Sequence, residues 1–420
     1  MTRMMCRLII RIFFLLLISG SFSTQNVLGS ELKVCKNCPI NDVAAAVKQA
    51  VSGDTIRLAS GTYTAVDVVI SKPLTLLSTD NAVLDGQLEK HILNIQSDSV
   101  SIIGLTFINA GRSFTKDYAA IYAHKINHFS LEKNRVIQPY FGFLIEKSHF
   151  GKIKDNTISG KTNTETDSGN GIHLWHCSEI EISGNETYGL RDGIYFEFVS
   201  NSQVINNRSH HNVRYGLHFM FSNHDEYRDN TFHDNGAGVA VMFSKFIVMK
   251  NNTFSKNWGT ASYGLLLKEI YDAEVIENHF EENTIAIFLE GTGRINYQRN
   301  QFYSNGWGVK VSGGCYTNIF VDNNFINNAL DIAYNSKMND NEFRHNYWSS
   351  YTGYDLDRDG VGDVPYRPVK LFSYIISQTP ESIVLLRSLF VDIINFSEKV
   401  SPIFTPDNLM DNAPAMEPIL

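Results

Sequence analysis

Residues 230–257 read NTFHDNGAGVAVMFSKFIVMKNNTFSKN and contain one full period of the repeat that decides the fold. The motif Asn-x-Phe-x-x-Asn begins at Asn230 and begins again 22 residues later at Asn252. Between the two copies, residues 238–242 (Gly-Val-Ala-Val-Met) place Val at alternate positions, which is the period of two of a half-buried strand. A repeat of this length, built from short strands with Gly and Asn at its corners, predicts a β-solenoid.

Copies of the motif continue on both sides of this stretch. Further copies begin at Asn278, Asn300, Asn323 and Asn341, and degenerate copies begin at Asn134, Asn156, Asn185 and Asn207. Most of the steps between neighbouring copies are 22 or 23 residues. The sequence therefore predicts an all-β fold, a right-handed parallel β-helix with coils of about 22 residues and with the Phe of each motif stacked inside.

The chain contains 39 Asn among 420 residues, and 29 of them lie between Asn134 and Asn346. Asn tolerates the left-handed backbone of a tight corner, bonds local backbone, and can bond a stacked copy of itself. We therefore assign the excess of Asn to the corners of stacked coils rather than to a ligand site.

Both ends of a solenoid need a cover. Residues 41–51 carry an amphipathic pattern that predicts an N-terminal capping helix, and an apolar pattern that follows Thr379-Pro380-Glu381 predicts a C-terminal amphipathic helix. The predicted organisation is a signal peptide at 1–30, an N-terminal cap at 31–54, the β-helix at 55–346, an acidic loop and final coil at 347–370, and a C-terminal helix and tail at 371–420.

The N-terminus has the layout of a secretory signal. Arg3, Arg7 and Arg11 precede or interrupt an apolar run at residues 12–18, and a plausible cleavage site lies near Ser30. The run is too short to span a bilayer, so we expect export across the cytoplasmic membrane, with a retained anchor helix as the alternative.

Charge and cysteine usage narrow the class of protein further. The chain has 36 basic and 44 acidic residues and a net charge of −8, so the electrostatic footprint of a nucleic-acid-binding protein is missing. Cys35 and Cys38 form a C-x-x-C pair at the start of the predicted mature chain, and this pair fits a disulfide, a metal clip or a redox pair.

Several segments of the sequence together resemble the NosD family. The opening Gly53-Asp54-Thr55-Ile56 leads into the run of coils, which ends at Tyr347-Trp348, and the acidic stretch 353–368 precedes the closing apolar helix. That family comprises periplasmic β-helix proteins of the nitrous oxide reductase maturation system. The resemblance implies an accessory protein rather than an enzyme, which works with a NosY-like ABC transporter permease and a NosF-like ATPase in supplying the copper-sulfur centre of nitrous oxide reductase. A copper chaperone is a further candidate partner.

The acidic stretch predicts a structural calcium site on its own residues. The candidate ligands, which follow the spacing of a calcium loop, are Asp355, Asp357, Asp359, the backbone carbonyl of Val361, and Asp363. Position 12 of the loop is Tyr366 rather than a bidentate Glu, which excludes an ordinary EF-hand. A polar turn held by Asx hydrogen bonds is the alternative.

A row of outward-facing side chains predicts a copper site. The positions two and four residues after the strand Gly carry the candidate ligands His173, Glu197, His218, Met220 and Met242. Thioether and imidazole groups suit Cu(I), and Met220 and Met242 occupy the same column in adjacent coils. The alternative is a surface patch that contacts a partner, since Met and aromatic residues also form adaptable interfaces.

The C-terminal helix is unusually apolar. Its candidate docking residues for the membrane permease are Ile383, Leu386, Leu389, Phe390, Ile393 and Ile394. Docking is what the resemblance implies, whereas the helical spacing alone equally fits a cap packed on the last coil.

The main rival function is a polysaccharide lyase or epimerase, because β-helices often carry such enzymes on an outer face. That chemistry needs paired carboxylates or a base beside a cation clamp, and the outward columns show no close acidic pair. A passive carbohydrate-binding surface is a third possibility.

Overall fold

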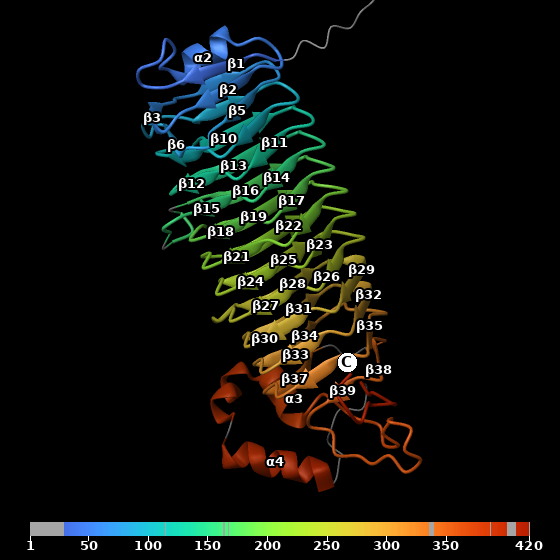
Figure 1. Ribbon diagram of the computed structural model, residues 1–420. Helices are drawn as coiled ribbons and strands as arrows, with labels where there is room; N and C mark the ends of the chain where they lie inside the picture. The colour runs from blue at the N-terminus through green and yellow to red at the C-terminus, as the bar shows by residue number, and fades with distance from the viewer. Residues whose placement is uncertain are drawn as a thin grey trace, which may run out of the picture.

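The computed structural model describes residues 29–113, 115–162, 164–166, 168–335, 340–386, 388–400 and 409–419. In this part of the chain, short strands wind into a parallel β-helix whose coils stack along one axis, with helix α2 (Val43–Gln49) at the N-terminal end and helices α3 (Leu371–Gln378) and α4 (Leu389–Val400) at the other (Figure 1). The predicted signal peptide lies almost wholly outside the described residues.

Three parallel sheets form the walls of the solenoid. Sheet A has 14 strands: β1 (Glu31–Val34), β2 (Thr55–Leu58), β5 (Thr75–Leu77), β8 (Ser101–Ile103), β11 (Ser130–Glu132), β14 (Lys152–Lys154), β17 (Glu181–Ser183), β20 (Gln203–Ile205), β23 (Glu226–Arg228), β26 (Val248–Lys250), β29 (Tyr271–Ile276), β32 (Gly293–Gln298), β35 (Ile319–Val321) and β38 (Glu342–Arg344). Sheet B has 13 strands: β3 (Gly61–Thr64), β6 (Ala82–Asp85), β9 (Thr106–Ile108), β12 (Arg135–Ile137), β15 (Thr157–Ser159), β18 (Glu186–Tyr188), β21 (Arg208–His210), β24 (Thr231–His233), β27 (Thr253–Ser255), β30 (His279–Glu281), β33 (Gln301–Tyr303), β36 (Asn324–Ile326) and β39 (Tyr347–Trp348). Sheet C has 12 strands: β4 (Val68–Ile70), β7 (Leu93–Ile95), β10 (Ala119–His124), β13 (Phe141–Glu146), β16 (Asn170–Trp175), β19 (Asp192–Glu197), β22 (Tyr215–Met220), β25 (Ala237–Met242), β28 (Tyr263–Lys268), β31 (Ile285–Glu290), β34 (Trp307–Ser312) and β37 (Leu330–Tyr334).

The interior of the solenoid is a continuous apolar core, as the alternating pattern predicted. The rings of Phe254 and Phe280 stack with their centroids 4.6 Å apart, and the stack continues to Phe302 at 5.1 Å. Val239 and Val241 of β25 are fully buried. Burial of such columns stabilises the fold by about 25 cal/mol for each Å² of apolar surface removed from water.

The predicted hydrogen-bonded ladders of Asn are confirmed, but the left-handed backbone of the corner lies on the residue before the ladder Asn, as at Glu277 (φ 57°), rather than on the Asn itself. Asn278 is fully buried. Its Oδ1 accepts hydrogen bonds from the backbone N–H of Asn252 at 2.9 Å and from the Nδ2 of Asn252 at 3.0 Å. Its own Nδ2 donates to the carbonyl of Met249 at 2.8 Å and to Oδ1 of Asn300 at 3.0 Å. Each side chain therefore links three coils, and its amide has no capacity left for a ligand.

The predicted last copy of the motif, which begins at Asn341, is wrong by one strand. Phe343 lies in β38 of sheet A, where it pairs with Phe320, and its ring does not continue the stack of Phe302. The stack ends instead with Trp348, whose ring lies 4.2 Å from that of Phe325. The prediction failed because sheet A carries its own inward aromatic column here, which mimics the spacing of the motif.

The N-terminal end is closed as predicted by a short helix. Val43, Ala46 and Val47 of α2 are buried against the first coil, and Asp42 caps the helix by accepting a hydrogen bond from the N–H of Ala45 at 2.7 Å. Cys35 and Cys38 form a disulfide, so the metal clip that the spacing also allowed is absent.

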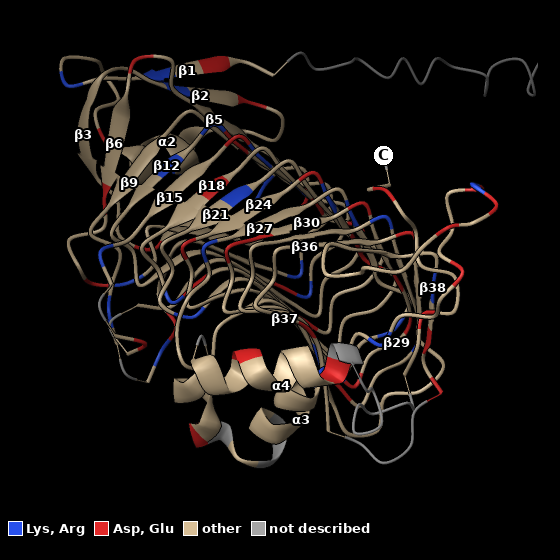
Figure 2. Cartoon of the chain, turned by 90° about the horizontal axis from the view of Figure 1, so that it is seen from below, with Lys and Arg blue, Asp and Glu red and all other residues tan. Residues whose placement is uncertain are grey.

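The C-terminal end differs from the single predicted helix. The apolar stretch forms α3, a 3₁₀ turn η1 (Pro380–Leu385) and α4, because the Pro at 380 cannot continue the helix that ends at residue 378. Phe372 and Ile376 of α3 and Val391 of α4 are buried in one cluster with Leu330 of β37. Figure 2 shows the two helices lying together beside the end of the solenoid.

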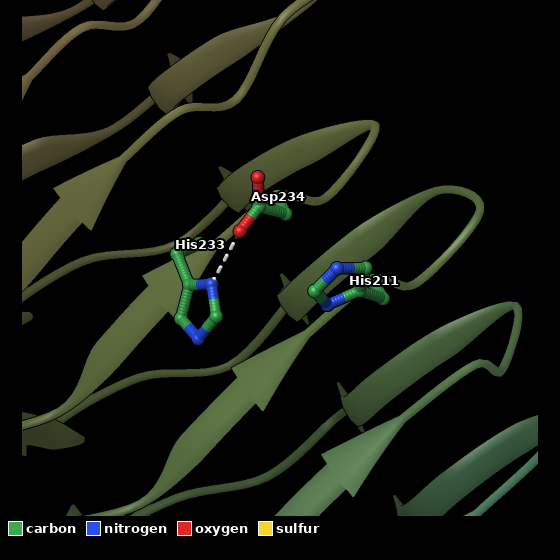
Figure 3. Close-up of side chains that lie close together, drawn as sticks. All are labelled: His211, His233 and Asp234. Carbon is green, nitrogen blue, oxygen red and sulfur yellow. Dashed lines mark hydrogen bonds and ion pairs between the residues drawn. The ribbon is translucent and has the colours of Figure 1, made fainter.

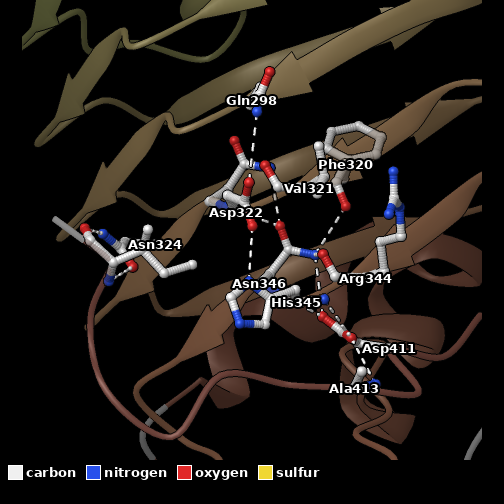
Figure 4. A network of polar contacts seen from close by, with 12 residues as sticks. Gln298, Phe320, Val321, Asp322, Asn324, Arg344, His345, Asn346, Asp411 and Ala413 are labelled. Atoms are coloured by element: carbon white, nitrogen blue, oxygen red, sulfur yellow. Dashed lines mark hydrogen bonds and ion pairs between the residues drawn. The ribbon is translucent and has the colours of Figure 1, made fainter. Parts of the chain in front are cut away.

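Residues 409–419 of the C-terminal tail contact the last coil and close it. The carboxylate of Asp411 accepts hydrogen bonds from the backbone N–H of His345 (3.1 Å) and Asn346 (3.0 Å) and from Nδ2 of Asn346 (3.0 Å) (Figure 4). It also accepts a hydrogen bond from Nε1 of Trp348 at 3.1 Å. Asn346, the last Asn of the ladder, directs only N–H donors towards the position of a next coil. A carboxylate, which can only accept hydrogen bonds, is therefore a suitable end to the ladder.

Candidate functional site

The predicted copper ligands lie on the outer face of sheet C, on strands β16, β19, β22 and β25. The parallel register places Met220 directly beside Met242 on the neighbouring strand. His218 lies two residues before Met220 on β22 and points to the same face, because alternate strand residues share a face. The three side chains therefore share one face of two neighbouring strands.

His218 is the least satisfied polar side chain of this face. It is 6% exposed, and neither of its ring nitrogens makes a hydrogen bond within the described part of the chain. The nearest charged group is the carboxylate of Asp192, 4.0 Å from Nδ1. Burial lowers the pKa of His218 to about 4, so the ring is neutral at periplasmic pH, as metal coordination requires.

Of the other two predicted copper ligands, Glu197 is a register neighbour of Met220, whereas His173 lies two strands from His218. Tyr195 separates His173 from His218, with its ring centroid 4.6 Å from the first imidazole and 4.9 Å from the second. Glu197 lies beside Met220 in the register, and the hydroxyl of Tyr195 lies 3.4 Å from Glu197 Oε2 and 3.8 Å from Met220 Sδ. The structure therefore places Glu197, Met220 and Met242 side by side in the register, with His218 two residues before Met220 on the same strand, and it leaves His173 two strands from His218.

The sequence reasoning missed the buried ion pair beneath this group. Asp192 is fully buried, and Arg214 clamps its carboxylate with two hydrogen bonds, 2.9 Å from Nε and 2.5 Å from NH2. The backbone N–H of Tyr215 also donates to this carboxylate at 3.3 Å, and the ring of Tyr215 packs 4.8 Å from that of His218. The available signal was a pair of opposite charges next to the strand Gly in two consecutive coils: Asp192 immediately before Gly193, and Arg214 two residues before Gly216.

The acidic loop brings together only part of its predicted ligand set. One carboxylate oxygen from each of Asp355, Asp357 and Asp359 lies within 4.8 Å of the others. The charge of Asp359 raises the pKa of Asp357, which is the repulsion that a bound cation would relieve. However, Asp355 accepts hydrogen bonds from the N–H groups of Arg358 and Gly360, at 2.6 and 2.9 Å, which is the Asx-bonded turn that we gave as the alternative.

The remaining two predicted calcium ligands lie outside that carboxylate group. Asp363 Oδ2 accepts a hydrogen bond from the N–H of Leu356 at 2.7 Å. Val361 forms an antiparallel bridge with Ala415 of the tail. Calcium binding by this loop therefore remains a prediction.

The predicted docking residues divide between an exposed and a packed set. Leu389, Phe390 and Ile393 of α4 are 74%, 53% and 55% exposed. Leu386 packs against the buried cluster around Val391 instead. Ile383 is 38% exposed, and Ile394 is partly buried. In the described part of the chain, no helix has the length and apolar character needed to cross a bilayer.

Comparison with known proteins agrees with this architecture. A family model described as "Periplasmic copper-binding protein (NosD)" matches residues 154–353. A relative from Pseudomonas aeruginosa named "Probable ABC transporter binding protein NosD" is 27% identical over 378 residues, covering 86% of this chain and 87% of the relative. A relative of the same name from Stutzerimonas stutzeri is 25% identical over 381 residues, covering 86% of each protein.

Solved structures show the same fold in proteins of distant sequence. The A-module of mannuronan C-5 epimerase AlgE4 from Azotobacter vinelandii aligns with a TM-score of 0.60 at 14% identity, covering 70% of this chain and 92% of the module. The catalytic domain of a GH87 alpha-1,3-glucanase aligns with a TM-score of 0.60 at 12% identity, covering 76% of this chain and 69% of the domain. These likenesses show the fold alone.

The solenoid and these comparisons define the chain as a periplasmic parallel β-helix protein. More specifically, the chain is similar over most of its length to proteins named NosD, and its residues 154–353 match the NosD family model, as the resemblance of its cap, coils and acidic stretch implied.

Proposed function

We propose that this protein is a periplasmic accessory factor of a Nos system, which binds copper on the outer face of sheet C and hands it over during maturation of the copper-sulfur centre of nitrous oxide reductase. The observation that carries the proposal is the buried, neutral imidazole of His218 with two unbonded ring nitrogens beside the adjacent pair Met220 and Met242. The copper-binding description of the matched family supports the choice of metal.

The donor set favours Cu(I). Thioether sulfur and imidazole nitrogen are ligands that Cu(I) prefers, whereas Mg²⁺ and Ca²⁺ prefer oxygen. A buried imidazole without a hydrogen bond costs about 1–3 kcal/mol of desolvation, and a bound metal would remove that cost. In this proposal copper is bound only transiently and is passed on to another protein. A small number of protein ligands suits this role, because the ion is then held weakly enough to be released. A copper chaperone would then be the supplier, and nitrous oxide reductase the recipient.

Competition with a Cu(I) chelator tests the site. The triple variant His218→Ala/Met220→Leu/Met242→Leu should bind Cu(I) at least tenfold more weakly, because all three soft donors are removed while the volume of the Met positions is kept. His173→Ala should change the affinity little, since His173 lies beyond Tyr195. Met416→Leu, in the tail, is the control for Met replacement. An unchanged affinity in the triple variant would refute copper binding here.

Docking on an ABC transporter is the second part of the proposal. The relatives are named as probable ABC transporter binding proteins, and α4 exposes Leu389, Phe390 and Ile393 on one helix. Three large exposed apolar side chains on one short helix suit a partner surface. We assign this face to the NosY-like permease, with a NosF-like ATPase as the energy-coupling subunit.

Point substitutions test docking better than a deletion of residues 380–420, since the tail closes the last coil through Asp411. Leu389→Asp/Ile393→Asp should abolish co-purification with the permease, because it places two charges in an apolar contact. Ser397→Asp, which adds a charge to an exposed position of the same helix, is the matched control. Retained co-purification of the double variant would argue against docking here.

A polysaccharide-active enzyme is less well supported. The buried carboxylate nearest the candidate site, Asp192, is held by both nitrogens of the Arg214 fork and by a backbone N–H. A carboxylate so engaged is a poor general base, because its lone pairs are occupied and its charge is balanced.

A further inference from the structure

A second group of imidazole and carboxylate side chains lies on sheet B, at the turn that follows strands β21 and β24. One ligand atom from each of His211, His233 and Asp234 lies within 4.8 Å of the other two (Figure 3). His210 and His233 are partners in the parallel register, and the next residues, His211 and Asp234, both adopt a left-handed backbone with φ of 53°. Two consecutive coils therefore present their side chains to the same small volume.

A chain of hydrogen bonds fixes the tautomer of His211. Glu186 Oε1 lies 3.3 Å from Nε2 of His210, so this nitrogen carries the proton and donates to the carboxylate. Nδ1 of His210 then accepts from Nδ1 of His211 at 2.8 Å. The remaining nitrogen of His211, Nε2, is left with a lone pair. A carboxylate that orients an imidazole in this way is the usual support of a metal-ligating His.

His233 is held at both ring nitrogens. The guanidinium Nε of Arg208 donates to its Nε2 at 3.2 Å, so the proton of the neutral ring lies on Nδ1. Nδ1 is 2.6 Å from Asp234 Oδ2 and donates to it. NH1 of Arg208 also donates to Glu186 Oε1 at 2.9 Å. Arg208 would therefore keep an ion-pair partner if its contact with the ring of His233 were broken.

We propose that His211, His233 and Asp234 form a site for a divalent transition-metal ion, with His210 and Glu186 orienting His211 and with Arg208 occupying the site in the absence of metal. Two imidazoles and one carboxylate suit Zn²⁺ or Cu²⁺ and leave a position open for water or a group from a partner. The site goes beyond the proposed handling of Cu(I), since it uses other donors on another sheet.

The geometry needs only a small adjustment to hold such an ion. Ligand atoms about 2.0–2.1 Å from a tetrahedral ion lie about 3.3 Å from one another, which is closer than the present limit of 4.8 Å. His211 and Asp234 are both exposed, so no surrounding core packing opposes the small shift that would bring the three ligand atoms closer together.

Arg208 gives the proposal a distinctive consequence. If the metal binds Nε2 of His233, Arg208 must vacate that lone pair. If the metal binds Nδ1 instead, the ring proton moves to Nε2 and opposes the N–H of Arg208. Either way the guanidinium competes with the metal, and its positive charge adds repulsion. Removal of Arg208 should therefore strengthen metal binding, which a merely structural cluster would not show.

Calorimetric titration of the full mature chain with Zn²⁺ tests the site, and Cu²⁺ electron paramagnetic resonance counts the nitrogen ligands. We expect one Zn²⁺ per chain, at least tenfold weaker binding in His211→Ala/His233→Ala, and severalfold tighter binding in Arg208→Ala. The control is His279→Ala, which removes an exposed imidazole beside Glu281 on the same sheet. We also expect two or more nitrogen couplings on Cu²⁺ in the wild type.

The outcomes separate this proposal from the copper site on sheet C. The double variant should keep the Cu(I) affinity of the wild type, and the triple variant on sheet C should keep Zn²⁺ binding. Unchanged Zn²⁺ binding in His211→Ala/His233→Ala, or an equal loss in His279→Ala, overturns the site. Binding that is unchanged or weaker in Arg208→Ala overturns the ligand assignment.

Discussion

Asp411→Asn tests the closure of the solenoid by its own tail. The substitution keeps the size of the side chain and replaces one acceptor oxygen with an NH₂ donor. In the wild type, Oδ2 accepts from Asn346 N and Nδ2 and from Trp348 Nε1, and Oδ1 accepts from the N–H groups of His345 and Ala413. Whichever way the new amide turns, its NH₂ meets at least two donors.

The magnitude follows from the hydrogen bonds that are lost. Bonds to a charged acceptor contribute about 1.5–3 kcal/mol each, so the loss of two amounts to about 3 kcal/mol or more. A solenoid is stabilised by interactions between neighbouring coils, so this loss should open the last coil rather than unfold the whole chain. Since 1.4 kcal/mol is a factor of ten, the opening equilibrium of the last coil should rise about 100-fold.

Hydrogen exchange measured by mass spectrometry is the assay, because it resolves local opening. Peptides that cover residues 343–366 should exchange about 100-fold faster in Asp411→Asn, while peptides of the central coils should exchange as in the wild type. Asn412→Ala, at the exposed neighbouring position of the tail, is the control. Exchange in residues 343–366 that stays within threefold of the wild type would refute the role of the carboxylate.

Three further predictions concern buried Asp225, buried Asn278 and the acidic loop. Burial raises the pKa of Asp225 to about 8, so the folded state holds a proton that the unfolded state loses near pH 4, and stability falls as the pH rises from about 4 to about 8. Asp225 contributes at most about 1.4 kcal/mol per pH unit to this fall in stability, and Asp225→Asn should abolish that contribution. If thermal melts of the variant from pH 5 to pH 8 show the same pH dependence as the wild type, the raised pKa of Asp225 is not its cause. Asn278→Ala should lower the free energy of unfolding in urea by about 3 kcal/mol or more, because it leaves hydrogen-bond partners on two neighbouring coils unpaired. The control Asn296→Ala, on the outer face of β32, should change this free energy little, and equal effects of the two substitutions would contradict a stabilising role of the ladder. Millimolar calcium should slow proteolysis of the acidic loop at 355–363, and an unchanged rate would leave the Asx-bonded turn as the sole description.

The fold was largely predictable from the sequence because the solenoid is built from local repeats. A motif of about 22 residues fixes which residues form strands, which side chains face inward and which Asn residues turn the corners. The errors lie at the C-terminal end, where neighbouring coils no longer repeat. There the motif spacing was matched to the wrong strand at Asn341, and the helix predicted to begin at Pro380 is a 3₁₀ turn followed by α4, with α3 preceding it.

The candidate sites were less predictable. The repeat correctly placed Met220 beside Met242, since parallel register converts spacing in sequence into adjacency in space. It could not show that Tyr195 separates His173 from His218, or that the Asp192–Arg214 pair lies beneath them, because these depend on side-chain direction and burial. Nor could it show the hydrogen bonds that orient His211.

The sequence by itself determined the parallel β-helix, its coil length, its Asn ladders and the resemblance to NosD, because each depends on a pattern repeated along the chain. Only the tertiary structure decided which outward side chains share a site, and that the carboxylate of Asp411 ends the ladder. The physical reason is that a repeat specifies its nearest neighbours. The burial of His218, and the contact of the tail with a coil 65 residues earlier in the chain, depend on how the whole chain is packed.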